Sequence, residues 1–262
     1  MTPHTLLLGG LLCGSLALSA LAPQDVGASA ELEAAFAQQG IRFAMEDGYV
    51  AFPVQVCIRE DLLEYLLVSD FGASHESLLS TAVSPTVLNT AFLTLGAAPG
   101  ENVRWVPKDP QPSEEEIQNG APTHDVVPPS GEGFYLYAAW KEDGETYVFR
   151  IEDLITNLER RRSMKRHGWV YLGSRLVPSE EEGEPSILAA ELEGNLINLS
   201  YFRAGNTLFS AALEDCVFQT IWLPNAPLLP ERGAQLTMIA AREPFGALPE
   251  AVAKDLVDVG TE

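Results

Sequence analysis

His75 and Glu76 are adjacent residues that place an imidazole beside a carboxylate. They follow one predicted strand and precede an apolar run, so we expect them on a loop at the end of a sheet, where functional residues often lie. Glu60 and Glu64 stand at the start of the preceding predicted strand. Together these groups could bind Zn²⁺ or another divalent metal ion. The four residues are the candidate ligand-binding site; alternatively, His75 orders a turn, and Glu76 caps it or faces solvent.

The sequence lacks the common catalytic and metal-binding motifs. It contains no H-x-x-x-H, H-E-x-x-H or C-x-x-C, and a site with three histidines would have to recruit His124 and His167. Ser77 and Ser174 lack the G-x-S-x-G frame of a hydrolase nucleophile. No catalytic residue is therefore assigned, and a divalent metal is the only cofactor suggested. We interpret the protein as a non-catalytic binding module, with a metal-dependent enzyme centred on His75 and Glu76, or an envelope scaffold, as alternatives.

The acidity of the chain limits the classes of partner. There are 16 Lys and Arg residues against 37 Asp and Glu residues, which gives a formal net charge of −21. Nucleic-acid binding needs a basic surface, and an anionic membrane repels an acidic protein, so neither is expected. A protein or a small anionic molecule is the expected kind of partner.

A cluster of basic residues stands out against this acidic background. It consists of Arg160, Arg161, Arg162, Lys165 and Arg166. These cations could lie at the C-terminus of a predicted helix, where they complement the helix dipole, or pair with the acidic run 180–182. They could instead bind a phosphate, a carboxylate or an acidic partner.

The first 30 residues have the features of a secretory signal. Residues 5–22 are uncharged and consist mainly of Leu, Gly, Ala and Ser. We expect cleavage after Ala30 or after Ala22, which would leave an exported protein, periplasmic or extracellular, with no stable membrane insertion. If the segment is not cleaved, it could anchor the N-terminus, because its length approaches the roughly 17–20 residues that span a bilayer.

Two cysteines, Cys57 and Cys216, remain after removal of this signal. An even pair in an oxidising compartment could form a disulfide. Both cysteines lie in apolar, strand-like runs, where a buried free thiol is equally natural. Both interpretations stay open.

Strands predominate among the predicted elements that position the candidate residues and the two cysteines. The alternation of apolar residues after Asp47-Gly48 predicts a hairpin over 41–58, and Asp143-Gly144 predicts another within 134–151. Ser84-Pro85 begins a predicted helix that ends at Gly96. Apolar residues at helical spacing predict a second helix over 151–164. Further strands are expected at 62–68, 169–177, 187–192, 196–202, 216–223 and 235–240.

The stretch 106–131 contains six prolines and an acidic run, which predicts a linker or a long exposed loop. It separates an N-terminal hairpin-strand-helix unit (31–105) from a C-terminal unit (132–262) with a hairpin, a helix and an all-β part. We therefore expect an α+β fold with mostly antiparallel sheets, about nine strands, and two main helices packed on one face.

Several phrases of the sequence are distinctive in combination. They are VCIREDLLEYLLV (56–68), SHESLLS (74–80), LNTAFLTLGAAPG (88–100), GWVYLGSRL (168–176), AAELEGNLINLSYF (189–202) and WLPNAPLLPERGAQLTMIAA (222–241). Together they resemble the YdjY-domain family of exported bacterial proteins, in the longer form of planctomycete-type bacteria. The resemblance covers about 40–242 and is weaker over 203–216. It implies export and a single structural module, marks Glu60, His75-Glu76 and Gly173-Ser174 as family-typical, and implies no activity.

Overall fold

The computed structural model of the protein describes residues 26–179 and 183–260. Most of the predicted signal segment therefore lies outside the described residues. The cleavage position after Ala22 falls outside them, and the position after Ala30 falls within helix α1 (Val26–Gln38). No helix in the described part of the chain is long and apolar enough to cross a membrane.

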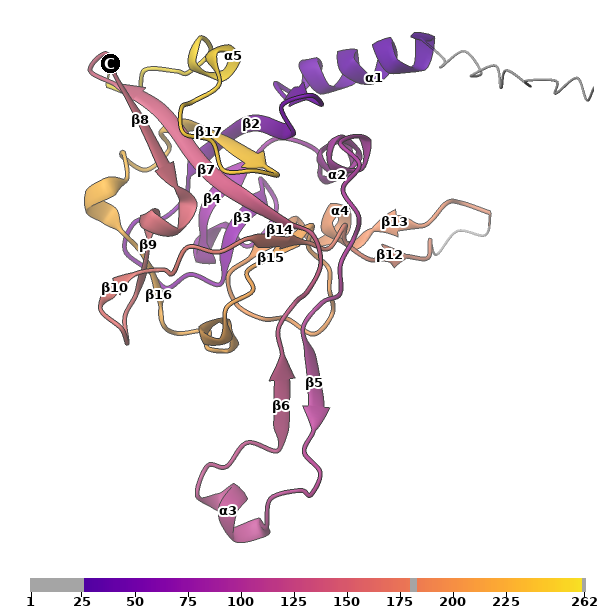
Figure 1. Cartoon of the computed structure of the whole chain (residues 1–262), viewed down its shortest axis with the longest axis vertical. Coiled ribbons are helices and arrows are strands. Elements are labelled where there is room, and N and C mark those ends of the chain that lie inside the picture. Colours follow the sequence, from indigo (N-terminus) through magenta and orange to yellow (C-terminus); the bar gives the residue numbers. More distant parts are fainter. Residues whose placement is uncertain (1–25, 180–182, 261–262) are drawn as a thin grey trace, which may run out of the picture.

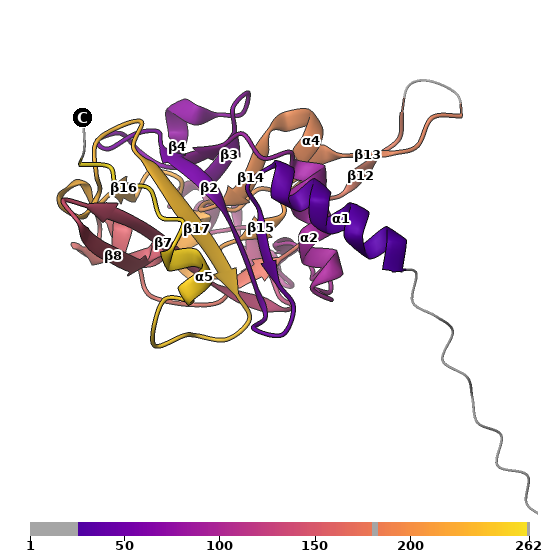
Figure 2. The ribbon, with the colours of Figure 1, turned by 90° about the horizontal axis from the view of Figure 1, so that it is seen from above.

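Eight strands of the described chain close into a mixed barrel, which Figure 2 shows from above. They are β2 (Tyr49–Val56), β3 (Tyr65–Ser69), β4 (Ser77–Thr81), β7 (Gly133–Glu142), β11 (Trp169–Tyr171), β14 (Asn195–Asn198), β15 (Phe209–Ser210) and β17 (Gln235–Ala241). Around the barrel the order is β2-β17-β7-β11-β15-β14-β3-β4, and β4 pairs back with β2. The strands are antiparallel except in the pairs β14–β15 and β3–β4.

The remaining elements lie outside this ring. Strand β1 (Arg42–Ala44) extends the sheet beside β2, and β8 (Glu145–Arg150) pairs with β7. Three short strands, β10 (Arg162–Ser163), β9 (Ile155–Asn157) and β16 (Trp222–Pro224), form a separate sheet, and β12 (Leu176–Val177) pairs with β13 (Ile187–Leu188). The short helices are η1 (Ser74–Glu76), η2 (Ile151–Leu154), α4 (Ala189–Glu193), η3 (Glu214–Val217), η4 (Ala226–Leu228) and α5 (Glu250–Ala253).

Strand β2 shows why the barrel wall is covered on both sides. Val50, Phe52 and Val54 belong to the main core, while the alternate residues Tyr49 and Ala51 belong to a second, smaller apolar cluster. The second cluster includes side chains of β7, β17 and the C-terminal segment around α5. A strand that is buried on both faces reads as a nearly continuous apolar run, as this one does.

Helix α2 (Pro85–Thr94) closes the core with an aromatic contact. The ring of Phe92 packs edge-on against Phe134 of β7 and Phe209 of β15, with ring centroids 5.6 and 4.8 Å apart. Tyr171 of β11 packs against the same rings and donates a hydrogen bond to Asn89 of α2 over 2.7 Å. Edge-to-face pairs of this kind stabilise beyond the burial of their area.

A two-stranded arm projects from the barrel, as Figure 1 shows. It consists of β5 (Arg104–Pro107), helix α3 (Glu114–Gln118) at its tip and β6 (His124–Val127). Ser113 begins α3 through a capping box with Glu116, in which each side chain accepts from the other's backbone N–H. The predicted linker at 106–131 thus forms most of an arm, and strands from both predicted units share one barrel.

The α+β class, the mostly antiparallel pairing and two main helices, α1 and α2, are confirmed, but the strands form a closed barrel rather than an open sheet with one helix-covered face. The strands close on themselves, and closure replaces the second layer that an open sheet needs. Closure depends on the pairing of β2 with β4, which no local pattern reveals.

The predicted helix over 151–164 is also wrong. Its residues form η2, β9 and β10 instead. Ile151, Leu154 and Ile155 are buried as expected, but Leu158 is exposed. A single 3₁₀ turn followed by a strand produced the same apolar spacing as the start of a helix.

The two predicted hairpins are confirmed, with one difference. Asp143 and Gly144 form a two-residue turn in which both residues have positive φ, as a type I′ turn requires. In the first hairpin Ala44 pairs with Tyr49, so the loop is four residues long rather than two. Of the other predicted strands, 187–192 is mainly helix α4, and 216–223 begins with η3.

We expect Phe92→Ala to lower the free energy of unfolding by about 3–5 kcal/mol, because it removes a fully buried ring from a packed aromatic cluster. Urea denaturation followed by tryptophan fluorescence measures the change. The matched control is Leu93→Ala on the exposed side of the same helix, with an expected change within about 0.5 kcal/mol. Equal effects of the two substitutions would contradict the role of Phe92 in closing the core.

Candidate functional site

His75 and Glu76 lie in η1, between β3 and β4. Their side chains are 78% and 40% exposed, and His75 Nε2 lies 3.7 Å from Glu76 Oε1. The expected position at the end of a strand is therefore confirmed, and the pair lies at the surface.

Glu64 joins this pair through its backbone N–H, which donates to the carbonyl of Glu76 over 2.9 Å. Partial burial and the charge of Glu76 raise the pKa of the Glu64 carboxyl, while His75 lowers it. Glu60 is exposed in the loop between β2 and β3. Across residues 26–179 and 183–260, no group of three or more His, Cys, Asp or Glu side chains is placed to hold a metal ion.

Ser77, which follows His75 and Glu76, and Ser174, which follows Gly173, both have structural roles. Ser77 is fully buried, and its hydroxyl donates to the carbonyl of Leu79. Gly173 and Ser174 form a turn with positive φ at both residues. The Ser174 hydroxyl donates to the carbonyl of Asn206 and accepts from the N–H of Ala190. These contacts hold the turn against α4 and the loop before β15.

Both cysteines are buried free thiols. Cys57 follows β2, and Cys216 lies in η3. Burial raises the pKa of both thiols, that of Cys216 to about 12, which keeps it protonated near neutral pH. Of the two interpretations left open by the sequence, the structure shows the free thiols.

The structure divides the basic cluster into three parts. Arg160 forms a bidentate ion pair with Asp215, with distances of 2.6 and 2.7 Å. Arg166 pairs with Asp153 over 2.6 Å. The remaining residues, Arg161, Arg162 and Lys165, are exposed and form no ion pair with a described residue. No long helix ends here, so the predicted interaction with a helix dipole is absent, and the acidic run 180–182 lies outside the described residues.

Three of these basic residues line one pocket of about 450 Å³, which we call the basic pocket. Its lining residues are Pro128, Arg160, Arg162, Lys165, Ala212, Leu213, Glu214 and Asp215. They come from the base of the arm, the β9–β10 hairpin with the residues just after it, and the segment that runs from Ala212 into η3. The pocket therefore combines cations with apolar surface beside the point where the arm leaves the barrel.

The basic side chains of the pocket differ in whether an ion pair within the protein already neutralises them. Hydrogen bonds from Arg160 lower the pKa of Asp215, and the charges of Arg160 and Arg162 lower it further, so this carboxylate stays ionised and orients Arg160. Seven described arginines, including Arg160, form ion pairs within the protein. Arg162 and Lys165 have no ion-pair partner in the described chain, although the protein carries a large excess of carboxylates. They are the cations available to a ligand.

A second hollow, of about 390 Å³, lies between α1, β2, β17 and α5. Its lining is mainly apolar, and its two charged residues, Arg42 and Asp255, pair with each other. A binding site combines an apolar surface with polar groups that are free to meet a ligand. The basic pocket meets this condition better, because two of its cations are not neutralised by an ion pair.

A buried polar network fixes the segment that carries Lys165. The fully buried Glu152 accepts hydrogen bonds through Oε1 from Arg150 Nη2 (2.6 Å), the N–H of His167 (3.1 Å) and Trp169 Nε1 (3.2 Å). Arg150 also donates to the carbonyl of His167, and His167 Nδ1 lies 3.1 Å from the carbonyl of Lys165. The network therefore ties residues 165–169, which include Lys165 of the basic pocket, to β8 and η2.

Burial sets the ionisation of this network. Desolvation raises the pKa of Glu152, while the Arg150 guanidinium opposes the rise. Desolvation lowers the pKa of His167 from 6.5 to about 4, so its ring is neutral near pH 7. A neutral ring that bonds a carbonyl through Nδ1 must carry its hydrogen on Nδ1.

Sequence reasoning found the cations of the pocket and missed its other walls. Leu213, Glu214 and Asp215 come from 203–216, a stretch for which the sequence suggested no binding role, and Pro128 comes from the predicted linker. Their proximity results from pairing between distant strands. Glu152 also went unnoticed, because its place beside Asp153 in a predicted helix gave no sign of burial.

We expect the network to make the free energy of unfolding depend on pH. Between pH 4 and 6.5 the unfolded chain protonates His167 and the folded chain does not, so stability rises with pH across this window. His167→Gln should remove at most about 3 kcal/mol of that rise, measured by urea denaturation at both pH values. His75→Gln, at an exposed histidine, is the matched control and should keep the wild-type rise. An unchanged rise in His167→Gln would contradict burial of a neutral ring.

Comparison of the chain with models of protein families found no family that matches it. Comparisons with curated proteins and with solved structures found no match either.

Proposed function

We propose that the protein is an exported, non-catalytic binding module and that the basic pocket binds an acidic segment of a protein partner. The observation that carries this proposal is the pair of cations, Arg162 and Lys165, that line a pocket with no ion-pair partner in the described chain. The apolar segment 5–22 and the resemblance to the YdjY-domain family support export.

The lining of the pocket favours a carboxylate ligand with apolar neighbours. Arginine binds carboxylates through a planar fork of donors, and lysine adds a compact charge. Pro128, Ala212 and Leu213 offer apolar surface beside these cations. Three basic and two acidic lining residues leave a formal excess of one positive charge, which suits single carboxylates along a peptide better than a dense polyanion.

A labelled peptide tests this proposal. Fluorescein-Ala-Glu-Glu-Leu should bind the full chain saturably in fluorescence polarisation, and Ala-Gln-Gln-Leu should not compete. Arg162→Ala/Lys165→Ala should weaken binding at least about tenfold, a loss of about 1.4 kcal/mol. Added salt should weaken binding as well, because exposed charges are screened within about 8 Å at physiological ionic strength.

The control for charge is Arg161→Ala/Arg232→Ala, which removes two positive charges from side chains outside the pocket lining. It should bind the peptide as the wild type does. Equal weakening in the two double variants would show that net charge, and not the pocket, governs binding, and would overturn the proposal.

A further inference from the structure

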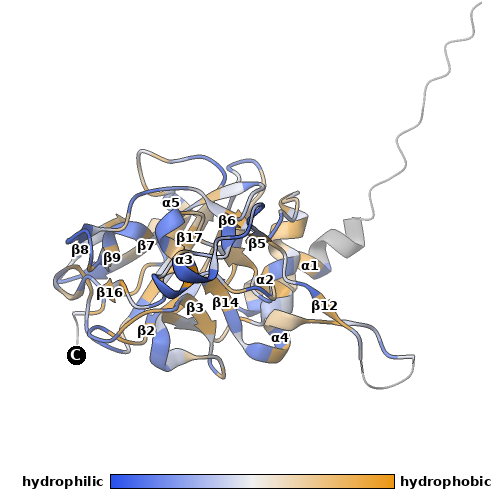
Figure 3. Cartoon of the chain, turned by 90° about the horizontal axis from the view of Figure 1, so that it is seen from below, coloured by the Kyte–Doolittle hydropathy of each residue, from blue (hydrophilic) through white to orange (hydrophobic). Residues whose placement is uncertain are grey.

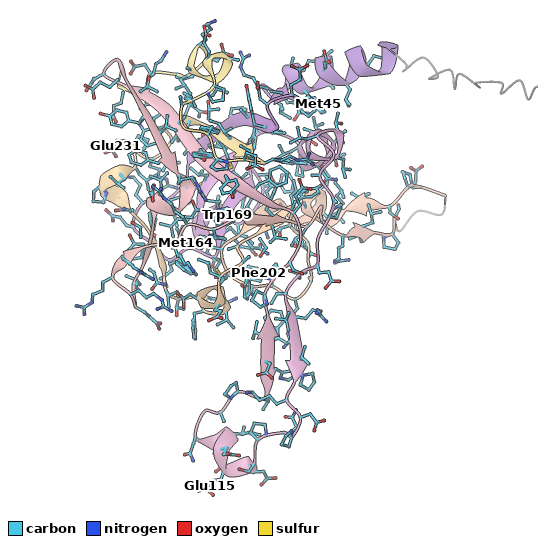
Figure 4. The ribbon with its side chains drawn as sticks, viewed as in Figure 1. Met45, Glu115, Met164, Trp169, Phe202 and Glu231 are labelled. Atoms are coloured by element: carbon cyan, nitrogen blue, oxygen red, sulfur yellow. The ribbon has the colours of Figure 1, made fainter. Side chains whose placement is uncertain are left out.

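The arm carries negative charge that complements the unpaired cations of the basic pocket. Residues 109–123, which form its outer part, carry four carboxylates and no Lys or Arg. Glu116 is used in the capping box of α3, but Glu114 and Glu115 form no ion pair with a described residue. Figure 3 shows α3 as a hydrophilic tip, and Figure 4 shows Glu115 at the far end of the arm from Met164, the residue before Lys165.

The arm is also incompletely covered. Strands β5 and β6 pair only with each other in the described structure, so both outer edges of the ribbon are open. Val106, Ile117 and Val127 expose a large part of their apolar surface along it. A two-stranded ribbon is marginally stable in water unless a further strand or surface packs on it. Its open edges and apolar side chains favour contact with another chain.

The position of the basic pocket at the base of the arm favours a second copy of this chain as the partner of the arm. Pro128, which lines the pocket, directly follows β6 at the base of the arm. When two identical arms lie side by side in opposite directions, the tip of each reaches the base of the other. Residues 104–113 span at most about 33 Å when extended at roughly 3.3 Å per residue, and the same length separates tip from base in both copies. The arrangement is a closed, twofold-symmetric dimer.

We infer that the acidic segment bound by the basic pocket is the arm tip of a second copy of this chain, with Glu114 and Glu115 of the partner subunit meeting Arg162 and Lys165. This inference rests on the proposed function and names its partner. Each copy gives one tip and one pocket, so the dimer holds two identical contacts, and the apolar side chains of β5 and β6 are covered between the arms.

Sedimentation velocity of the full chain, up to about 100 μM and at about 0.15 M salt, tests the inference. We expect a dimer whose Kd rises at least about tenfold in the tip variant Glu114→Lys/Glu115→Lys and in the pocket variant Arg162→Glu/Lys165→Glu. An equimolar mixture of the two variants should dimerise again, because the reversed tip meets the reversed pocket and the other contact is native. Glu46→Lys/Glu184→Lys, at exposed sites outside the arm, should dimerise as the wild type does.

A wild-type chain that stays monomeric, or a mixture that associates no better than either variant alone, would overturn the inference. If the acidic peptide still binds in that case, the pocket keeps its proposed function with another partner. The tip variant lies on the arm, outside the barrel, so its result stands even if the pocket variant does not fold, which circular dichroism would reveal.

Discussion

Closure of the barrel is the constraint on which the rest of the structure depends. Strand β2 pairs with β17 from Tyr49 to Gln55 and with β4 at its end, so the ring of eight strands has no free edge there. A closed ring has one packed interior, and its strands come from both sides of the arm. Because the wall is complete, segments that do not belong to it must lie outside. The arm, the β9–β10 hairpin with the residues after it, and the segment that leads into η3 are such additions, and they form the basic pocket.

The link between barrel and pocket is a buried carboxylate. Glu152 binds Trp169, which belongs to the wall, and His167 and Arg150, which belong to the attached segments. Removing a carboxylate from water costs several kcal/mol, and the ion pair with hydrogen bonds offsets that cost only in good geometry. Glu152 Oε2 and His167 Nε2 have no hydrogen-bond partner among the described residues. Burying these groups therefore costs some folding stability. In return, the network holds the backbone that leads to Lys165 in a single position.

The sequence predicted those features that depend on neighbouring residues. Asp143-Gly144 predicts its turn because few residue pairs accept positive φ twice, and Ser84-Pro85 predicts the start of α2 through its cap. The helix expected over 151–164 failed because apolar spacing over the eight residues 151–158 cannot separate a 3₁₀ turn and a strand from a helix. The residues of the basic pocket likewise fall into those that the sequence indicated and those that it did not. The cations lie close together in the sequence, which therefore indicated them as a cluster. Asp215 and Pro128 join them only after distant strands pair.

The acidic surface repels every acidic chain, a second copy of this one included, so attraction has to come from contacts inside the basic pocket. Of the arginines described, most are neutralised by a nearby carboxylate, so the surface offers few places where an anionic segment is attracted. At physiological ionic strength the repulsion between whole molecules is screened beyond about 8 Å, while contacts inside a pocket act over shorter distances. Repulsion from the whole surface therefore opposes all acidic chains alike, and a partner is selected by the segment that fits Arg162 and Lys165. The excess of carboxylates and the two unpaired cations of the basic pocket are two parts of one recognition mechanism.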